Sequence, residues 1–363
     1  MTAEPKQQQF PCTGCGATLF WDPGSSSLKC PYCGAENTVA PTPEAEPVQE
    51  MDFLAHLHTA MESAETMEAI TVRCDGCGAE QSMRPGQTAG NCAFCGSGMV
   101  AQAVVKRVLK PRALLPFSIT NNQACDAFVG WINGLWFAPS NLKRMANREG
   151  IKGVYVPAWT YDCQVDTDYT GQRGDDYWDT ETYTVTENGQ SVTKTRQVRR
   201  TRWSSAWGRV HDTFDDVLVL AVENLPPKAR HLEPWDLPAL VPYDDRYLSG
   251  FVGESYTIDL PNGFELAKQV MSPVIDGTIR SDIGGDHQQI STKDSNYYDI
   301  TFKHILLPMW ISAYRYQDRV FTFLVNARTG EVQGDRPWSV WKILFTVLAI
   351  LAAVAGTILA VKS

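Results

Sequence analysis

The sequence lacks the short motifs that mark most nucleotide-dependent and hydrolytic enzymes. It contains no Gly-Lys dipeptide, and therefore no phosphate-binding P-loop, and it has no H-E-x-x-H, G-x-S-x-G or G-x-G-x-x-G motif. The histidines beyond residue 200 are scattered rather than clustered. These absences exclude helicase and ATPase activity and predict a protein that is not an enzyme.

Basic residues are also in short supply. The chain has 32 Lys and Arg against 41 Asp and Glu, a formal net charge of −9. Because nucleic-acid backbones are bound mainly by Lys and Arg, this balance disfavours a protein whose main role is to wrap nucleic acid, although it allows a local basic site. The first thirty residues contain no apolar signal-peptide core. We therefore expect the ten cysteines to stay reduced.

Eight of the ten cysteines form two clusters of identical spacing. Each cluster consists of two C-x2-C pairs separated by fourteen residues, and a shift of 62 residues superimposes the clusters together with several glycines and prolines. The members are Cys12, Cys15, Cys30 and Cys33 in the first cluster, and Cys74, Cys77, Cys92 and Cys95 in the second. The pattern indicates a duplicated module of the zinc-ribbon type.

Four thiolates at roughly 2.3 Å from one ion form a closed tetrahedral site, so we expect two structural Zn2+ ions and no catalytic metal. The glycine after each pair should adopt a positive φ to close the turn. A rubredoxin-like iron site and a redox dithiol remain alternatives, the former because of the Cys-Pro-Tyr-Cys-Gly run at 30–34. Both modules are nearly neutral, which favours a protein partner over nucleic acid. Cys125 and Cys163 lie outside the motifs and should be buried small hydrophobes.

Residues 343–361 form a stretch of nineteen residues without a charge. As a helix it would span roughly 28 Å, close to the hydrocarbon thickness of a bilayer. Trp338 and Trp341 precede it, where interfacial aromatic residues belong, and Lys342 and Lys362 flank it. We expect a tail-anchored, single-pass protein of the inner (plasma) membrane with the bulk of the chain in the cytoplasm. A buried core helix is the alternative, but it should show a polar face.

The rest of the chain predicts an α+β fold with a largely antiparallel sheet. The Pro- and Glu-rich linker should let the first ribbon move independently. Thr120 and Gln123 predict a capping box at the start of a helix. The predicted units are rubredoxin-like zinc ribbon 1 at 10–36, the linker at 37–50, an amphipathic helix at 51–69, zinc ribbon 2 at 70–98, the α+β domain at 99–337 with a projecting hairpin near 175–203, and the membrane anchor at 338–363.

The hairpin contains the one run of basic residues, from Lys194 to Arg202. If Asn188-Gly189 is its turn, cross-strand partners have numbers that sum to 377. The predicted pairs are Glu181 with Arg196, Asp175 with Arg202, Trp178 with Arg199, and Tyr183 with Lys194. Opposite charges and cation–π contacts would then meet, so we interpret the hairpin as a self-neutralising arm in solvent. Binding of membrane headgroups or nucleic acid remains an alternative.

Two short runs resemble one another: Val156-Pro157-Ala158-Trp159 and Leu307-Pro308-Met309-Trp310. They suggest two related half-domains within the α+β unit.

These runs, the ribbons and further segments carry a resemblance to a known family. The segments are 115–119, 153–159, 214–219, 307–310, Asn326, 329–332 and 336–337. The chain resembles bacterial TFIIB-type zinc-ribbon membrane proteins over most of its length. Members are often labelled primosomal protein N′, replication factor Y or superfamily II helicase, a label not carried over because the motor motifs are absent. Some relatives accompany flotillin-like (SPFH) or phage-shock-protein-A-like membrane-stress proteins.

The resulting hypothesis is a non-enzymatic, membrane-anchored adaptor or scaffold that recruits such protein partners at the inner membrane and contacts the lipid bilayer through its C-terminal helix. The alternative is a membrane-tethered nucleic-acid-binding zinc-ribbon protein of the replication or transcription type.

Overall fold

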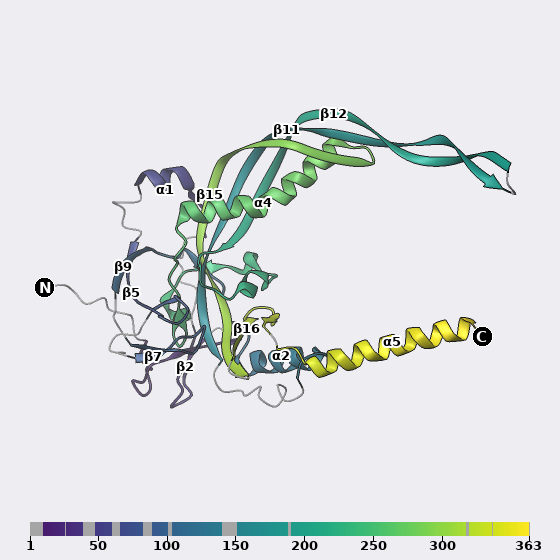
Figure 1. The fold of residues 1–363 in the computed structure, drawn as a ribbon. Helices are drawn as coiled ribbons and strands as arrows, with labels where there is room; N and C mark the ends of the chain where they lie inside the picture. The colour runs from purple at the N-terminus through teal and green to yellow at the C-terminus, as the bar shows by residue number, and fades with distance from the viewer. Residues whose placement is uncertain are drawn as a thin grey trace.

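The computed structural model describes residues 10–25, 27–38, 48–59, 66–82, 89–100, 104–139, 151–187, 190–316, 319–335 and 337–362. A nine-stranded, mostly antiparallel sheet forms its centre. The two cysteine modules lie on the far side of the body from the tip of a long arm (Figure 1). This architecture confirms the predicted α+β class.

Three very long strands dominate the sheet: β11 (Lys152–Glu187), β12 (Gln190–Leu220) and β15 (His287–Tyr316), in the order β12-β11-β15. Together they leave the body as a curved arm, and helix α4 (Leu260–Ile283) packs along the root of that arm (Figure 1). The other strands of the sheet are β4 (Met51–Asp52), β10 (Ala113–Leu114), β13 (Val241–Pro242), β14 (Val252–Gly253), β16 (Arg319–Asn326) and β17 (Val332–Gly334).

The remaining elements are short. Module 1 contains β1 (Phe20–Asp22), β2 (Ser27–Lys29) and β3 (Glu36–Thr38), and module 2 contains β5 (Thr66–Arg73), β6 (Glu80–Ser82), β7 (Ala89–Asn91), β8 (Gly98–Val100) and β9 (Val104–Leu109). The helices besides α4 are α1 (Phe53–Thr59), α2 (Asn121–Gly134) and α5 (Val340–Lys362), with 3-10 turns η1 (Pro227–His231), η2 (Leu237–Ala239) and η3 (Asp245–Leu248).

The predicted helix over 51–69 is wrong in its second half. Helix α1 ends at Thr59, and Thr66–Arg73 form strand β5, which pairs with β6 and β9. Residues 60–65 lie outside the described part of the chain. The β-branched residues Thr66, Ile70 and Val72 favour an extended backbone, and pairing with two neighbouring strands outweighs the helical spacing of the apolar residues.

The hairpin register matches the prediction. β11 and β12 pair from Glu187 and Gln190 inward to Cys163 and Phe214 with numbers that sum to 377. The turn at 188–189 itself lies outside the described residues. A two-residue Asn-Gly connection leaves no freedom in strand alignment, which is why the register could be calculated from sequence.

The predicted ion pair between Arg196 and Glu181 is confirmed at 2.6 Å. Arg199, Arg200 and Arg202 contact diagonal neighbours instead of the directly opposite residues that the sequence predicted. Arg199 pairs with Asp176, Arg200 with Asp179 at 3.0 Å, and Arg202 lies 5.2 Å over the ring of Tyr177. Strand twist brings a long side chain closer to a diagonal residue of the facing strand than to the residue directly opposite. The charges of the arm therefore neutralise one another, but through different partners from those predicted.

The two resembling runs lie opposite one another, because β11 and β15 pair antiparallel through them. Trp159 donates its indole N–H to the carbonyl of Ile258 at 2.9 Å. Trp310 does the same to Ile119 at 2.8 Å. Each acceptor stands immediately before the N-cap of a helix, α4 in one case and α2 in the other.

Backbone contacts repeat in the same way. In each half, the N–H of an alanine that follows the second strand donates to the carbonyl of the proline within the first strand. The carbonyl of the same alanine accepts from the backbone N–H groups of the two residues that precede the helix N-cap. The residues are Ala221, Pro157, Thr257 and Ile258 in one half, and Ala327, Pro308, Ser118 and Ile119 in the other. The structure therefore supports two related half-domains. Helix α4 packs chiefly on β11 and β12, and α2 packs on β16 and β17, so both halves contribute to one core.

Both helices begin at side-chain caps. Thr120 and Gln123 form the predicted capping box of α2. Asp259 caps α4 by accepting from the Asn262 N–H at 2.9 Å. The apolar face of α4 then packs along β11 and β12, with Met271 fully buried.

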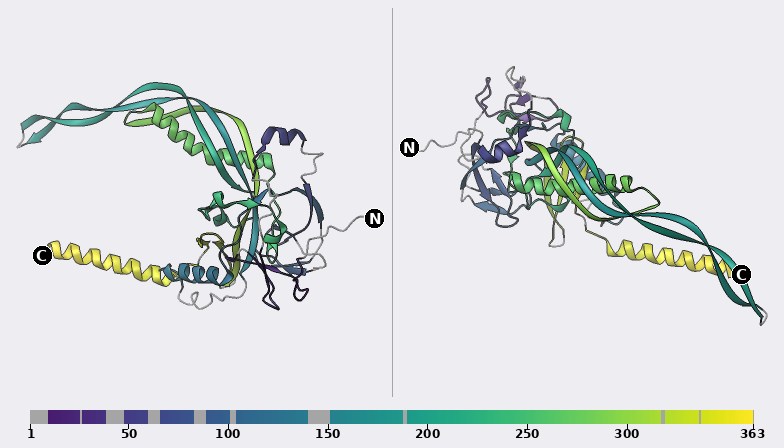
Figure 2. Two further views of the ribbon diagram at one scale, coloured as in Figure 1. Left: turned by 180° about the vertical axis from the view of Figure 1, so that it is seen from behind. Right: turned by 90° about the horizontal axis from the view of Figure 1, so that it is seen from above.

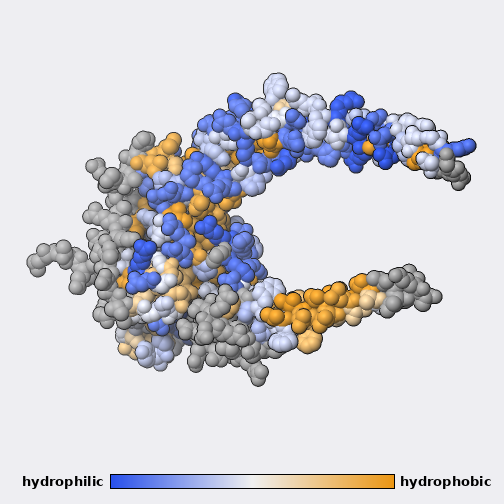
Figure 3. All heavy atoms as spheres, viewed as in Figure 1, coloured by the Kyte–Doolittle hydropathy of each residue, from blue (hydrophilic) through white to orange (hydrophobic). Residues whose placement is uncertain are grey.

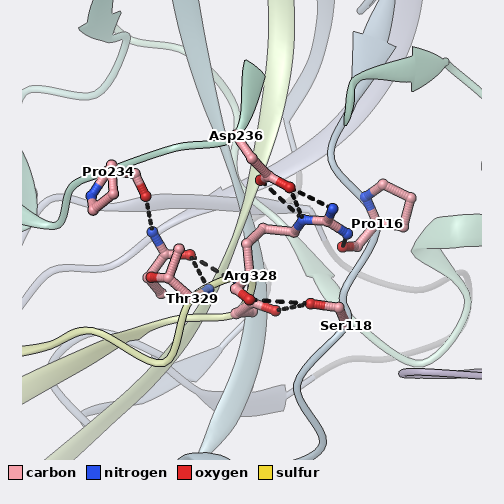
Figure 4. Close-up of polar contacts among 8 residues, drawn as sticks. Pro116, Ser118, Pro234, Asp236, Arg328 and Thr329 are labelled. Carbon is pink, nitrogen blue, oxygen red and sulfur yellow. Dashed lines mark hydrogen bonds and ion pairs between the residues drawn. The ribbon is translucent and has the colours of Figure 1, made fainter. Parts of the chain in front are cut away.

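The loop after β16 is fixed by polar contacts to two segments (Figure 4). Arg328 donates to the carboxylate of Asp236 at 2.6 Å and to the Pro116 carbonyl at 3.1 Å. The Ser118 hydroxyl donates to the Ala327 carbonyl at 3.1 Å. These contacts hold the segment before α2 against the sheet, where it also meets module 1.

Candidate metal centres

The sulfur atoms of each cysteine cluster lie within 4.8 Å of one another. The shortest separations are 3.5 Å for Cys12–Cys33 and Cys15–Cys30, and 3.6 Å for Cys74–Cys95 and Cys77–Cys92. These distances are far longer than the ~2.05 Å of a disulfide bond. They are close to the ~3.8 Å edge of a tetrahedron of sulfurs each ~2.3 Å from a zinc ion.

The turns between paired cysteines adopt the predicted geometry. The four closing glycines, Gly16, Gly34, Gly78 and Gly96, have φ between +73° and +77°. Each donates its N–H to the carbonyl of the first cysteine of its pair at 2.8–3.1 Å. A Cβ would be strained at such φ values, so glycine is required there.

Backbone amides also point at the sulfurs. The N–H of Gly14 donates to Cys12 Sγ, and that of Phe94 donates to Cys92 Sγ, both at 3.4 Å. The amide of Cys33 lowers the pKa of Cys30 to about 6, and a hydrogen bond from Cys77 lowers the pKa of Cys92 to about 5. These contacts favour the thiolate form that binds a metal, and metal binding would displace the protons of the remaining thiols.

The donor set fits zinc in both clusters. Four thiolates leave no coordination position open for water, so the ion would be structural and would contribute folding free energy. The two clusters thus suggest two metal ions, most consistent with zinc by their ligands. Neither supplies a site at which a substrate could bind the metal.

Module 2 is built into the body. Glu254, which is 5% exposed, accepts from the Glu80 N–H at 2.7 Å, and burial raises its pKa well above the ordinary value. Further hydrogen bonds join the module to four body segments: the Ser255 N–H to the Glu80 carbonyl, Lys152 to the Asn91 carbonyl, Asn224 to the Gly78 carbonyl, and Thr322 to the Phe94 carbonyl. The second ribbon is therefore continuous with the core.

Module 1 is docked through Trp21 and the neighbouring Leu19, whose carbonyl accepts from the Ser249 hydroxyl at 2.6 Å. Trp21 is 5% exposed, donates its indole N–H to the Phe117 carbonyl at 3.2 Å, and contacts the ring of Tyr247 at 4.6 Å. Its backbone N–H donates to the Ser249 carbonyl at 3.0 Å. The expectation that this ribbon moves independently is therefore wrong. The missed signal was Trp21 itself, a large apolar residue in a module too small to bury it alone.

The second knuckle, which is the turn between the second pair of cysteines, distinguishes the two modules. Tyr32, between Cys30 and Cys33, is 82% exposed, whereas Phe94, at the equivalent position of module 2, is 3% exposed. The aromatic ring projects into solvent in the first module and is buried under the sheet in the second. The duplicated spacing of the cysteines does not indicate this difference.

A charge cluster around the buried Lys303, not predicted from sequence, lies where the connection between the modules meets the sheet. Lys303 Nζ lies 2.7 Å from Asp216, 3.0 Å from Glu50 and 4.0 Å from Asp162. Burial raises the pKa of Asp162 to about 7, and a hydrogen bond with Asp162 lowers the pKa of Glu50 to about 2. The ion pair between Lys303 and Glu50 holds the chain beside β4 against β15. The available signal was a lysine and an aspartate interrupting otherwise apolar strand segments.

Helix α5 is long and apolar enough to span a membrane. Its segment Val340–Thr357 has a mean hydropathy of 2.0, and none of it is buried. At its base, Trp338 and Trp341 are exposed as predicted, and Trp136 from the loop after α2 is exposed beside them. Lys342 donates to the Ala138 carbonyl at 2.8 Å and so joins that loop to the helix. Cys125 and Cys163, by contrast, are buried in the core.

Comparison with known proteins gave one full-length similarity. The chain is 25% identical over 357 residues to the uncharacterized protein YdjG of Bacillus subtilis (strain 168). That alignment covers 97% of this chain and 96% of the relative. No family model and no solved structure matches the chain.

Proposed function

We propose that the protein is a non-enzymatic, membrane-anchored adaptor that presents the first zinc ribbon to a protein partner on the cytoplasmic side of the inner membrane. The observation that carries the proposal is the exposed knuckle of module 1. Tyr32 is 82% exposed on a module that Trp21 fixes to the body. An aromatic side chain on a rigid support is the usual centre of a protein interface, because little ordering is needed when the partner binds.

The surroundings of module 1 favour the same use. A hollow of about 590 Å3 opens between module 1, the start of α2 and the loop at Gly250. Its apolar walls include Phe20, Phe251 and Trp310. A partner segment with an apolar side chain fits this hollow. A flotillin-like (SPFH) or phage-shock-protein-A-like membrane-stress protein is the partner class that also fits the membrane location.

Membrane insertion imposes a further condition on α5. In all views of Figures 1 and 2, the arm and α5 leave the body toward the same side. Figure 3 shows an apolar α5 and a largely hydrophilic arm. A bilayer crossed by α5 along this direction would also enclose the arm, whose charges and open strand edges are incompatible with hydrocarbon. We infer that α5 turns relative to the arm on insertion.

The test uses the full chain in its own membranes. Complexes are cross-linked in cells, purified, and compared between wild type, Tyr32→Ala, and Trp207→Ala as a control at another exposed aromatic. We expect Tyr32→Ala to lose specific partner bands at unchanged zinc content and membrane level, while the control retains them. Retention of every partner by Tyr32→Ala would refute the proposed role of module 1.

The alternative function, nucleic-acid binding, has less support. The arginines at 196, 199 and 200 are already paired with carboxylates of the same arm. Salt-dependent binding of the detergent-solubilised chain to single- and double-stranded nucleic acid tests this alternative, because phosphate contacts weaken steeply with salt.

A further inference from the structure

The outer half of the arm stands alone. Strand β15 stops pairing with β11 at Gly174, and α4 ends at Ile283. From the pair Asp175 and Arg202 outward, β11 and β12 are the only paired strands among the residues that the structure describes. A two-stranded ribbon in water is marginally stable, and both of its outer edges present unpaired backbone groups.

Charge is segregated between the two strands of this ribbon. All charged residues of β11 between 175 and 186 are acidic, and all those of β12 between 191 and 202 are basic. The acidic residues are Asp175, Asp176, Asp179 and Glu181, and the basic ones are Lys194, Arg196, Arg199, Arg200 and Arg202. One outer edge of the arm is therefore acidic and the other basic.

The register also separates the two faces of the ribbon. Side chains two residues apart on a strand point to the same face of the ribbon, and so do the side chains of directly opposite residues. By this rule most of the charged residues lie on one face. The opposite face near the tip consists of hydroxyl and amide side chains: Thr180, Thr182, Thr184, Thr193, Thr195, Gln197 and Ser191. The charged face is thus a ladder whose two sides carry opposite sign.

We propose that the arm pairs edge to edge with the arm of a second copy of this chain, with the acidic edge of β11 in one copy against the basic edge of β12 in the next. When the two arms point in the same direction, these two strands run antiparallel, which suits hydrogen bonding between them. Each arginine on the charged face then lies between carboxylates on both sides. The outer halves of the arms thus form one continuous sheet that runs through several copies.

The charges select this arrangement over a twofold dimer. Pairing β12 with β12 would place two rows of arginines and Lys194 beside each other, and pairing β11 with β11 would do the same for carboxylates. Like charges directly opposite one another destabilise a sheet and suppress the wrong pairing. A contact between two different edges is heterologous and produces a ring or a filament, so the expected assembly contains three or more copies.

The test is zero-length cross-linking of the full chain in detergent micelles. Carbodiimide joins the Lys194 amine to a neighbouring carboxylate as an amide with loss of water. An equimolar mixture of unlabelled and 15N-labelled protein is cross-linked and digested. We expect Lys194 joined to acidic-strand peptides of the other isotope, and light scattering that gives three or more chains per particle. Same-isotope links alone, or a monomer, would overturn the proposal.

Matched variants locate the contact. The triple variant D175N/D179N/E181Q removes acidic charge from one edge, and the pair Thr182→Ala and Thr195→Ala changes the opposite face of the same arm. We expect the acidic-edge variant to weaken association about tenfold or more and the control to leave it unchanged. Equal association of both variants would contradict the proposed edge. If the triple variant unfolds the arm, the proposal is tested by the isotope cross-linking of the wild-type protein alone.

Discussion

The two cysteine modules share their spacing, glycine conformations and sulfur separations, yet they relate to the body in opposite ways. Module 2 buries its second knuckle, with Phe94 3% exposed, whereas module 1 exposes the equivalent Tyr32 at 82%. Duplication preserved the metal site and changed what surrounds it. We conclude that module 2 stabilises the body and module 1 offers a surface, and each prediction below tests this difference.

The largest effect is expected from removing a metal ligand. Cys92→Ala should prevent cooperative folding of the body, since structural zinc contributes on the order of 10 kcal/mol and module 2 is continuous with the core. Cys30→Ala should lose one zinc and leave the body folded. Thermal unfolding by circular dichroism, together with zinc content, measures both. Equal damage from the two substitutions would remove the distinction between the modules.

The second-largest difference is expected in the stability effects of replacing the aromatic residues of the two second knuckles, Phe94 and Tyr32. Phe94→Ala is expected to lower the free energy of unfolding by about 3–5 kcal/mol, because it creates a cavity under the sheet. Tyr32→Ala should stay within about 0.5 kcal/mol, because its side chain is exposed. Urea unfolding of the two variants measures the contrast. A large loss for Tyr32→Ala would mean that module 1 is also structural at this position.

The docking of module 1 can be weakened selectively. Trp21→Phe keeps the apolar contact but removes the indole hydrogen bond to Phe117, at a cost of about 1 kcal/mol. We expect faster amide hydrogen exchange at 10–38 and unchanged exchange in module 2. Ser25→Ala, at the exposed turn of the same hairpin, serves as the control. Faster exchange across the whole body would show that the module does not undock separately.

The connection between the modules should respond to pH. The folded state raises the pKa of Asp162 to about 7. The stabilisation by its proton is therefore complete below the ordinary pKa of an aspartate and is lost as pH rises through about 7. We expect the urea midpoint to fall between pH 5 and pH 8 in the wild type, and to fall less in Asp162→Asn. Identical pH profiles would show that the proton on Asp162 does not stabilise the folded state.

Much of the chemistry was predictable from sequence because it depends on local geometry. The four cysteines and the closing glycine of each knuckle define the metal site, and Asn188-Gly189 determined the register of the arm. The burial of Phe94 and the docking of Trp21 depend on segments far away in the chain, so no local pattern indicated them. The cluster around Lys303 was missed for the same reason, since it unites residues from four separate strands or loops.

A chelator titration followed by hydrogen exchange tests the central claim most directly. Cys15 and Cys33 of module 1 are exposed, whereas every cysteine of module 2 is buried or half-buried. The account predicts that the first zinc leaves module 1 with exchange rising only at 10–38, and that loss of the second zinc coincides with unfolding of the body. Loss of zinc from module 2 while the sheet remains protected would contradict it.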